Sequence, residues 1–331
     1  MNIAVFASHN GSGLQAIIDA CKSKRLDAKV CAVFSNNSGS YALQRARDNE
    51  IPAFHFSQKV ISDPEALDRE ILDTLAKCDT DIIFLAGYLK KLSPSILRAY
   101  MFRIFNIHPS LLPKYGGKGM HGINIHKAVL AAGEAETGIT IHQVNEKYDE
   151  GKIIAQRRVP VLACDTPESL AARVLEEEHV FIVETLDEIV TSYGLFDACR
   201  KGNIELAKRI IDKGIDPNRV IAHGWTPLLL AVEHGEVELV DFLLSNGADA
   251  NYQPNGDFSR WTALHHAVHR YTDEDIHSIN EEYEKNIWVI IELLLKKGAL
   301  PDLKDKSGKS PMDYAKEYNC ITLVELLNTS L

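Results

Sequence analysis

The stretch of residues 105–113, Phe-Asn-Ile-His-Pro-Ser-Leu-Leu-Pro, constrains the fold of this chain more than any other. Its apolar residues predict the end of a buried strand, which stops at Pro109 because proline cannot donate to a β-ladder. Asn106 and His108 are two residues apart, so their side chains leave the strand on the same face. An amide and a titratable imidazole placed there suit a reaction that builds negative charge on oxygen. A short Asn-x-His pattern alone more often marks a capped strand end.

Strands and helices alternate with short connections through about the first 190 residues. Apolar runs predict strands over residues 2–7, 30–35, 51–56, 81–87 and 104–107. This order predicts an α/β fold with a doubly wound, mostly parallel sheet, whose ligands bind at the carboxyl ends of the strands. Residues 138–144 and 153–159 predict an antiparallel hairpin at one edge of the sheet. Residues 166–190 predict a helix that closes the domain.

A glycine-rich turn, residues 8–13, connects the first strand to the first helix. Free N–H groups at such a helix start attract an anion such as phosphate, which makes Gly11, Ser12 and Gly13 candidates for substrate binding. The turn has neither the Gly-Lys-Ser/Thr of a P-loop nor the glycine spacing of a dinucleotide site. It fits a plain connection between two elements as well as it fits a phosphate site.

Composition limits the classes of protein to which this chain can belong. A length of 331 residues predicts two domains, and a formal net charge of −10 disfavours general nucleic-acid binding. Six scattered cysteines, with no pair at metal-ligand spacing, predict a reduced, cytoplasmic protein without a metal site. The N-terminus lacks the charged flank of a signal peptide, and no apolar run approaches the length that spans a bilayer, so no membrane partner is expected.

The sequence changes character at about residue 193. Glycine-centred turns recur at a spacing of 33 residues, and Trp-Thr-Pro-Leu at 225–228 returns as Trp-Thr-Ala-Leu at 261–264. This pattern resembles the ankyrin repeat, an all-α solenoid of stacked helix pairs. It implies an ankyrin-repeat domain over residues 193–331, with about four repeats and an insertion near 270–285, after a catalytic domain over residues 1–192. Such a domain is expected to bind a protein, a second subunit or a nucleotide ligand.

The first 190 residues, taken together, resemble the folate-dependent formyltransferase family. The motifs that carry the resemblance are Asn-Gly-Ser at 10–12, Leu-Ala-Gly at 85–87, Asn-Ile-His-Pro-Ser-Leu-Leu-Pro at 106–113 and Tyr-Asp-Glu-Gly at 148–151. The resemblance implies an enzyme that transfers a formyl group from 10-formyltetrahydrofolate, its co-substrate, to a primary amine, without a metal. Within the family, these residues look most like members that formylate glycinamide ribonucleotide in purine biosynthesis. The acceptor is therefore expected to be a small amine that bears a phosphate or a nucleotide.

The same resemblance implies roles for particular residues. Asn106 and His108 would stabilise the oxyanion and Asp149 would pair with His108, which makes these three the catalytic candidates. Cofactor binding is implied for Leu89, Lys90, Lys91, Leu92, Asn106, Gln143, Val144, Asn145 and Asp149. Acceptor binding is implied for Gly11, Ser12, Gly13, Pro109, Ser110 and Glu178.

Some positions depart from the family pattern. The family usually has glycine where this chain has His9, and asparagine where it has Gly13. Together with the ankyrin repeats, these departures keep a second acceptor open, an amino sugar carried on a nucleotide in surface-polysaccharide biosynthesis. A third interpretation makes the protein an interaction module with an inactive catalytic domain, and the intact Asn106, His108 and Asp149 disfavour it.

Overall fold

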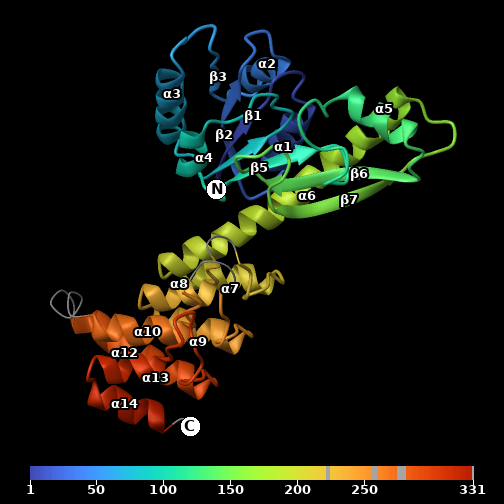
Figure 1. Cartoon of the computed structure of the whole chain (residues 1–331). Coiled ribbons are helices and arrows are strands. Elements are labelled where there is room, and N and C mark those ends of the chain that lie inside the picture. Colours follow the sequence, from blue (N-terminus) through green and yellow to red (C-terminus); the bar gives the residue numbers. More distant parts are fainter. Residues whose placement is uncertain (221–223, 255–258, 274–280, 330–331) are drawn as a thin grey trace. The chain divides into compact units, whose positions relative to one another are not determined.

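The structure is a computed structural model that describes residues 1–220, 224–254, 259–273 and 281–329. The chain divides into two compact units, Met1–Val190 and Thr191–Leu331 (Figure 1). The sequence-based boundary, after residue 192, lies two residues further along. Each unit buries apolar residues of its own.

The first unit is built on one seven-stranded sheet with the order β3-β2-β1-β4-β5-β6-β7. Its strands are β1 (Asn2–Phe6), β2 (Lys29–Ser35), β3 (Ala53–His55), β4 (Ile82–Leu85), β5 (Ile104–His108), β6 (Glu136–Gln143) and β7 (Ile153–Pro160). Its helices are α1 (Ser12–Lys22), α2 (Tyr41–Asp48), α3 (Pro64–Lys77), α4 (Pro94–Ala99), α5 (Ile123–Ala131) and α6 (Pro167–Arg200). Strands β1 to β5 pair in parallel, whereas β6 pairs antiparallel with β5 and β7 antiparallel with β6. The predictions of a mostly parallel sheet and of an edge hairpin are confirmed.

The central strands are continuous apolar runs because both of their faces are covered. All four residues of β4 are buried, and so are four of the five residues of β1. This is the burial expected of parallel strands covered by helices, in contrast to the alternation of a half-exposed strand. Phe6 of β1 stacks on Phe34 of β2, with ring centroids 4.6 Å apart. The result is a rigid sheet from which the carboxyl ends of the strands project loops.

Three of those loops meet because β1, β4 and β5 are neighbours. The turn after β1 is tied to the loop after β4 by two hydrogen bonds, from Ser8 N to Gly87 O at 3.2 Å and from Leu89 N to Ser8 Oγ at 2.9 Å. Strand β5, next to β4, ends with Asn106 and His108. The parallel topology therefore brings the glycine-rich turn, residues 86–92 and the two polar side chains of β5 to one edge of the sheet.

Helix α6 is longer than the sequence pattern predicts. The expected helix ended at residue 190, but α6 has 34 residues and runs to Arg200, into the segment expected to open the first repeat. Gly194 lies inside α6, where a glycine costs a helix only about 1 kcal/mol relative to alanine. A Cβ at Gly194 would lie 3.2 Å from Ile210 Cδ1, so glycine also allows close packing of the following helix.

Paired helices make up the second unit. They are α7 (Ile204–Asp212), α8 (Pro227–Glu233), α9 (Val237–Ser245), α10 (Ala263–Thr272), α12 (Glu281–Lys296), α13 (Pro311–Glu317) and α14 (Ile321–Asn328). Helices α8, α10 and α13 each begin after a hydroxyl residue whose side chain accepts a backbone N–H, namely Thr226, Thr262 and Ser310. This capping explains why the Thr-Pro-Leu pattern recurs. The helical repeat region is confirmed, and part of the expected insertion, residues 274–280, lies outside the described residues.

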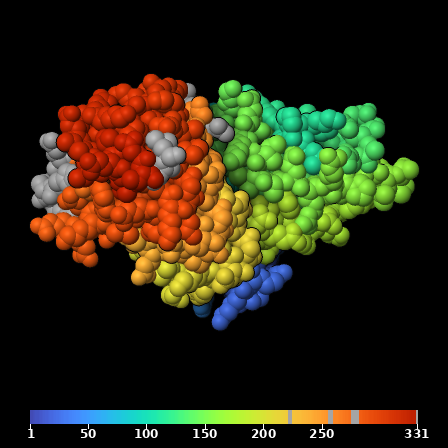
Figure 2. Space-filling model, turned by 90° about the horizontal axis from the view of Figure 1, so that it is seen from below, coloured from blue at the N-terminus to red at the C-terminus, as the bar shows by residue number. Residues whose placement is uncertain are grey.

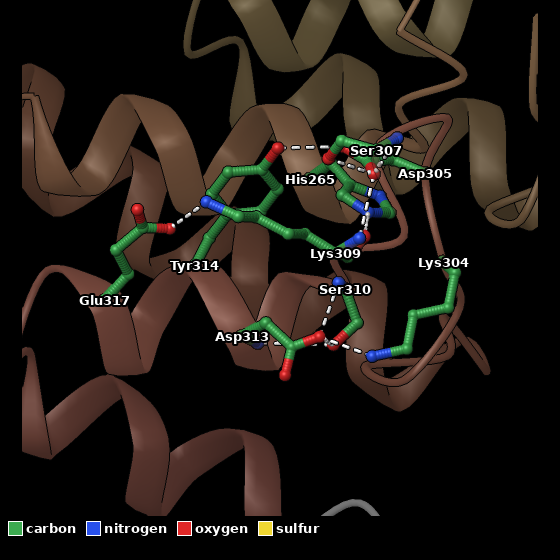
Figure 3. A network of polar contacts seen from close by, with 9 residues as sticks. All are labelled: His265, Lys304, Asp305, Ser307, Lys309, Ser310, Asp313, Tyr314 and Glu317. Atoms are coloured by element: carbon green, nitrogen blue, oxygen red, sulfur yellow. Dashed lines mark hydrogen bonds and ion pairs between the residues drawn. The ribbon is translucent and has the colours of Figure 1, made fainter.

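A buried carboxylate, Asp305, fastens the loop before α13 to the repeat that precedes it. Figure 3 shows its contacts within the loop and with Tyr314 of α13. Its Oδ2 accepts hydrogen bonds from Trp261 Nε1 at 2.9 Å and Tyr314 Oη at 2.8 Å. Its Oδ1 accepts from the backbone N–H of Ser307 and Lys309 at 2.8 and 3.0 Å. The surface of the last helices, red in Figure 2, covers this end of the repeats.

Candidate active site

Strand β5 presents the two polar side chains that the sequence singled out. Asn106 is half-buried and His108 is 5% exposed. Phe105 and Ile107, which alternate with them, are buried on the other face of the strand. The apolar alternation of β5 therefore fixes the direction of both polar side chains.

His108 is held by one carbonyl and one carboxylate. Its Nε2 donates a hydrogen bond to the backbone oxygen of Tyr115 at 2.9 Å, because a carbonyl can only accept. Its Nδ1 lies 3.7 Å from Asp149 Oδ2. Burial lowers the pKa of His108, and although Asp149 and the Tyr115 carbonyl oppose this, the net pKa lies below its usual value. The imidazole is therefore neutral at neutral pH, with Asp149 in place to stabilise a second proton.

Asp149 lies between two imidazoles. It adopts a left-handed backbone conformation, with φ of 55°, that directs its carboxylate inward. Oδ2 accepts a hydrogen bond from Gly117 N at 2.8 Å, and Oδ1 lies 3.6 Å from His142 Nε2. Burial raises the pKa of Asp149, but His142, the Gly117 N–H and the neighbouring His108 outweigh burial, so the net pKa is lowered. Asp149 is an anion over the whole neutral range.

His142 is a member of this cluster that sequence reasoning missed. It stands opposite Asn106 in the β5–β6 pairing, and its Nε2 lies 3.0 Å from Asn106 Nδ2. Its Nδ1 donates to the Gln143 carbonyl at 2.8 Å, so Nε2 is free to accept from the Asn106 amide. This contact orients the amide and leaves the second amide hydrogen for a ligand.

Hydrogen bonds from Ser110 and from Thr140 of β6 hold the loop that follows His108. Ser110 is fully buried, and its hydroxyl donates to Lys114 O at 2.7 Å. Thr140 of β6 donates to Ser110 O at 2.6 Å and accepts from Leu112 N at 3.1 Å. The side chain of Ser110 thus holds the loop, and Pro109 is half-buried beside it.

The glycine-rich turn meets α6. Gly11 has φ of 67°, and a Cβ there would lie 2.7 Å from Ala42 Cβ, so the position requires glycine. Gly13 faces Glu178, whose Oε1 lies 3.8 Å from the position that a Cβ of Gly13 would occupy. Burial raises the pKa of Glu178 to about 7. The structure thus brings together residues from the start of α1 and from α6 that the sequence assigned to acceptor binding.

The residues predicted to bind the cofactor lie in two loops at the same edge. Leu89, Lys90 and Lys91 are exposed and Leu92 is buried. In the second loop, Val144 N donates to Ile104 O at 2.9 Å, and Asn145 is exposed. The loops approach one another where the Lys91 ammonium lies 5.8 Å from the ring centre of Tyr148.

Residues 1–186 match the family model described as formyl transferase. This match covers more than half of the chain. The chain belongs to the formyl transferase family. Residues 195–279 match the model for ankyrin repeats.

Several relatives of the formyl transferase unit are phosphoribosylglycinamide formyltransferases. A chloroplastic phosphoribosylglycinamide formyltransferase of Vigna unguiculata is 47% identical over 188 residues, which are 56% of this chain and 60% of that protein. The phosphoribosylglycinamide formyltransferase of Escherichia coli K12 is 41% identical over 54% of this chain and 82% of its own length. The chain thus spans less than two thirds of the plant relative and most of the bacterial one.

Solved structures agree with the sequence relatives. The crystal structure of phosphoribosylglycinamide formyltransferase from Bacillus halodurans superposes with a TM-score of 0.54 at 34% identity, over 57% of this chain and 95% of that one. This confirms the fold of the formyl transferase unit. Among the described residues, no group of three or more His, Cys, Asp or Glu is arranged to hold a metal ion. No helix in the described part of the chain is long and apolar enough to cross a membrane.

Proposed function

We propose that the formyl transferase unit transfers a formyl group from 10-formyltetrahydrofolate to the amine of glycinamide ribonucleotide. The observation that carries the proposal is the cluster at the carboxyl edge of the sheet. There Asp149 lies between His108 and His142, and His142 orients the amide of Asn106. The names of the relatives support this acceptor.

The cluster fits the charge that develops in formyl transfer. The acceptor nitrogen attacks the formyl carbon, and the carbonyl oxygen becomes an oxyanion in the tetrahedral intermediate. Asn106 donates its remaining amide hydrogen to that oxygen. The oxyanion favours the uptake of a solvent proton by His108, which returns it when the carbonyl reforms, and the ionised Asp149, 3.7 Å from Nδ1, stabilises the imidazolium in between.

The second half of the reaction requires one proton transfer. The carbonyl reforms, the bond from the formyl carbon to the folate nitrogen breaks, and that nitrogen receives a proton. The acceptor amine loses one proton, so in the balance one proton moves from the amine to the folate nitrogen. We assign Asp149 the role of holding the water that carries this proton, because its carboxylate remains ionised in the site.

The two loops at the edge would hold the folate. Residues 89–92 and 143–145 would border the pterin, while Gly11, Ser12, Gly13 and Glu178 would face the acceptor. Glu178, ionised above a pKa of about 7, would bind the acceptor's amino end. The amino-sugar alternative has no support from the relatives, which are named for the ribonucleotide.

We further propose that the ankyrin repeats bind a protein partner.

The proposal is tested by one assay with two acceptors. The full chain is supplied with 10-formyltetrahydrofolate and either glycinamide ribonucleotide or a panel of nucleotide-linked amino sugars, and release of tetrahydrofolate is followed by absorbance. We expect turnover with the ribonucleotide and none with the amino sugars. Turnover with an amino sugar alone would overturn the proposed acceptor but not formyl transfer, and turnover with neither would overturn both.

A further inference from the structure

The loop of residues 109–122 connects β5 to α5 and supplies two backbone groups to the catalytic cluster. The Tyr115 carbonyl accepts the hydrogen bond from His108 Nε2 at 2.9 Å, and the Gly117 N–H donates to Asp149 Oδ2 at 2.8 Å. A displacement of residues 115–117 would therefore move the partner of His108 and the partner of Asp149 together. The position of this loop sets the orientation of both side chains.

Tyr115 holds a backbone conformation that is unfavourable for its residue type. Its φ is 56°, in the left-handed region, which costs a residue with a Cβ about 1–2 kcal/mol. Gly117 and Gly119 follow with φ of 94° and 92°, and glycine leaves a loop many other conformations. A strained residue between flexible ones persists only where contacts from the surrounding structure hold it.

Glu134 makes such contacts from the turn after α5. Its Oε1 accepts a hydrogen bond from Tyr115 Oη at 3.0 Å, and its carboxylate oxygens lie 2.9 and 3.2 Å from Lys114 Nζ. The side chain of Lys114 is 65% exposed and that of Glu134 is 25% exposed, so solvent weakens the ion pair. Glu134 N donates to Val129 O at 3.3 Å, which ties the residue to the end of α5. The partly buried bond to Tyr115 is thus the main hold of α5 on the loop.

We propose that Glu134 is a positioning residue for formyl transfer, which acts through the Tyr115 hydroxyl to hold the backbone groups that bind His108 and Asp149. The inference rests on the proposed function and adds to it a residue outside the catalytic cluster. The contacts run from Glu134 to the Tyr115 hydroxyl, and from the Tyr115 carbonyl to His108. Without the first contact, Tyr115 can leave the left-handed conformation, and its carbonyl then turns away from the imidazole.

The test compares Glu134→Ala with the unchanged full chain. With glycinamide ribonucleotide we expect kcat to fall about tenfold, because the loop no longer holds the catalytic side chains in place. The KM values of both substrates should stay within about twofold, because the residues assigned to folate and acceptor binding lie outside residues 114–122. Glu134→Gln keeps an oxygen that accepts from the Tyr115 hydroxyl, so it should recover most of the lost kcat. An unchanged kcat in Glu134→Ala would overturn the inference.

Glu136→Ala is the matched control, because it removes the same charge two residues further along the chain. The partner of Glu136 is Arg158 of β7 and not a residue of the loop. We expect Glu136→Ala to keep the kcat of the unchanged protein. Equal losses of kcat in Glu134→Ala and Glu136→Ala would assign the effect to surface charge and overturn the inference.

Tyr115→Phe tests the route from Glu134 to the cluster, because it removes only the hydroxyl. It should lower kcat by about the same factor as Glu134→Ala. If the carboxylate acts through the hydroxyl, the double variant should lose no more than about twofold beyond either single variant. Losses that multiply in the double variant would contradict this route.

Hydrogen–deuterium exchange of the free protein measures the hold on the loop without a substrate. We expect the Gly117 amide to exchange about tenfold faster in Glu134→Ala, because its bond to Asp149 opens more often. Glu136→Ala should leave that rate unchanged. Faster exchange with an unchanged kcat would overturn the positioning role, and a lower kcat with unchanged exchange would overturn its mechanism.

Failure of the proposed function has a different signature. If the unchanged protein does not formylate the ribonucleotide, the acceptor assignment fails, and the exchange comparison alone decides about Glu134. Faster exchange at Gly117 in Glu134→Ala then retains Glu134 as the residue that holds the backbone groups of the cluster. Equal exchange in the two proteins removes that role as well.

Discussion

At the scale of single residues, the site depends on one carboxylate shared by two imidazoles. Asp149 lies 3.7 Å from His108 Nδ1 and 3.6 Å from His142 Nε2, and it also accepts the Gly117 N–H. Sequence motifs predicted Asn106, His108 and Asp149 as candidates. They did not predict His142, because its place opposite Asn106, 36 residues earlier in the sequence, depends on the register of two antiparallel strands. Alternation within β6 shows only that His142 shares a face with other residues of its own strand.

Glu178 gives a pH prediction at the same scale. Its pKa is raised by burial to about 7, so below that pH the free enzyme holds a neutral carboxyl, and above it a carboxylate that binds the acceptor's amino end. We expect kcat/KM for the acceptor to rise with pH through about 7, and Glu178→Gln to lose that rise while its KM increases about tenfold. Steady-state rates from pH 5.5 to 8.5 measure both.

The control for this variant is its stability. A carboxyl whose folded-state pKa is raised makes the fold less stable as pH increases from its unfolded pKa, about 4.3, to about 7. Glu178→Gln removes this penalty, so it should unfold at pH 8 no more readily than the unchanged protein. A pH profile in Glu178→Gln that still rises through 7 would assign that titration to another group.

At the scale of elements, a hairpin positions the catalytic carboxylate. The connection between β6 and β7 contains Asp149 and Gly151, and a Cβ at Gly151 would lie 1.7 Å from Gln143 O. No alanine fits there without moving the loop.

Helix α6 ends ten residues later than its sequence pattern predicts. The pattern predicts an end at residue 190, but good helix formers extend the helix to Arg200, because Gly194 alone does not end it.

We predict that Gly151→Ala lowers kcat/KM for formyl transfer by about tenfold or more, because it displaces the loop that carries Asp149. The matched control is Gly39→Ala, since the only atom near a Cβ there is Asn37 Oδ1 at 3.8 Å. Gly39→Ala should keep the activity of the unchanged protein. Equal activities in the two variants would show that the hairpin tolerates displacement.

At the scale of the whole molecule, the two units bury separate apolar cores, and tryptophan fluorescence reports on one of them. The three tryptophans of the chain, Trp225, Trp261 and Trp288, all lie in the ankyrin unit. The sequence revealed both units because each has its own periodicity, strand–helix alternation in one and a repeat of 33 residues in the other. It could not reveal the Asp305 network, which joins a loop to Trp261 across 44 residues of sequence.

The Asp305 network gives a stability prediction. Burial raises the pKa of Asp305, but bonds from Ser307, Tyr314, Lys309 N and Trp261 outweigh burial and hold the pKa well below its usual value. A lowered pKa of this kind stabilises the fold fully above the unfolded pKa of about 3.9, and the stabilisation is lost as pH falls below it. Asp305→Asn should lower the free energy of unfolding of the ankyrin unit by roughly 2 kcal/mol at pH 7.

Tryptophan fluorescence during denaturant unfolding measures this change selectively. The loss should shrink as the pH is lowered from about 4 toward 2, because the unfolded chain then binds a proton on Asp305 that the folded chain binds only at a still lower pH. Asp302→Asn is the control, since Asp302 is an exposed carboxylate in the same loop. A tryptophan transition that Asp305→Asn leaves unmoved at pH 7 would contradict a structural role for the network.

The most direct test of the central claim is the rate of formyl transfer in Asp149→Asn. The measurement follows tetrahydrofolate release and N-formyl glycinamide ribonucleotide by mass, in the variant and in the unchanged full chain. We predict one formylated product per folate released in the unchanged protein. In Asp149→Asn we predict a fall in kcat of about 10²-fold or more with folate binding retained, because the imidazolium and the proton-carrying water lose their anion. A near-normal rate in Asp149→Asn would contradict the account.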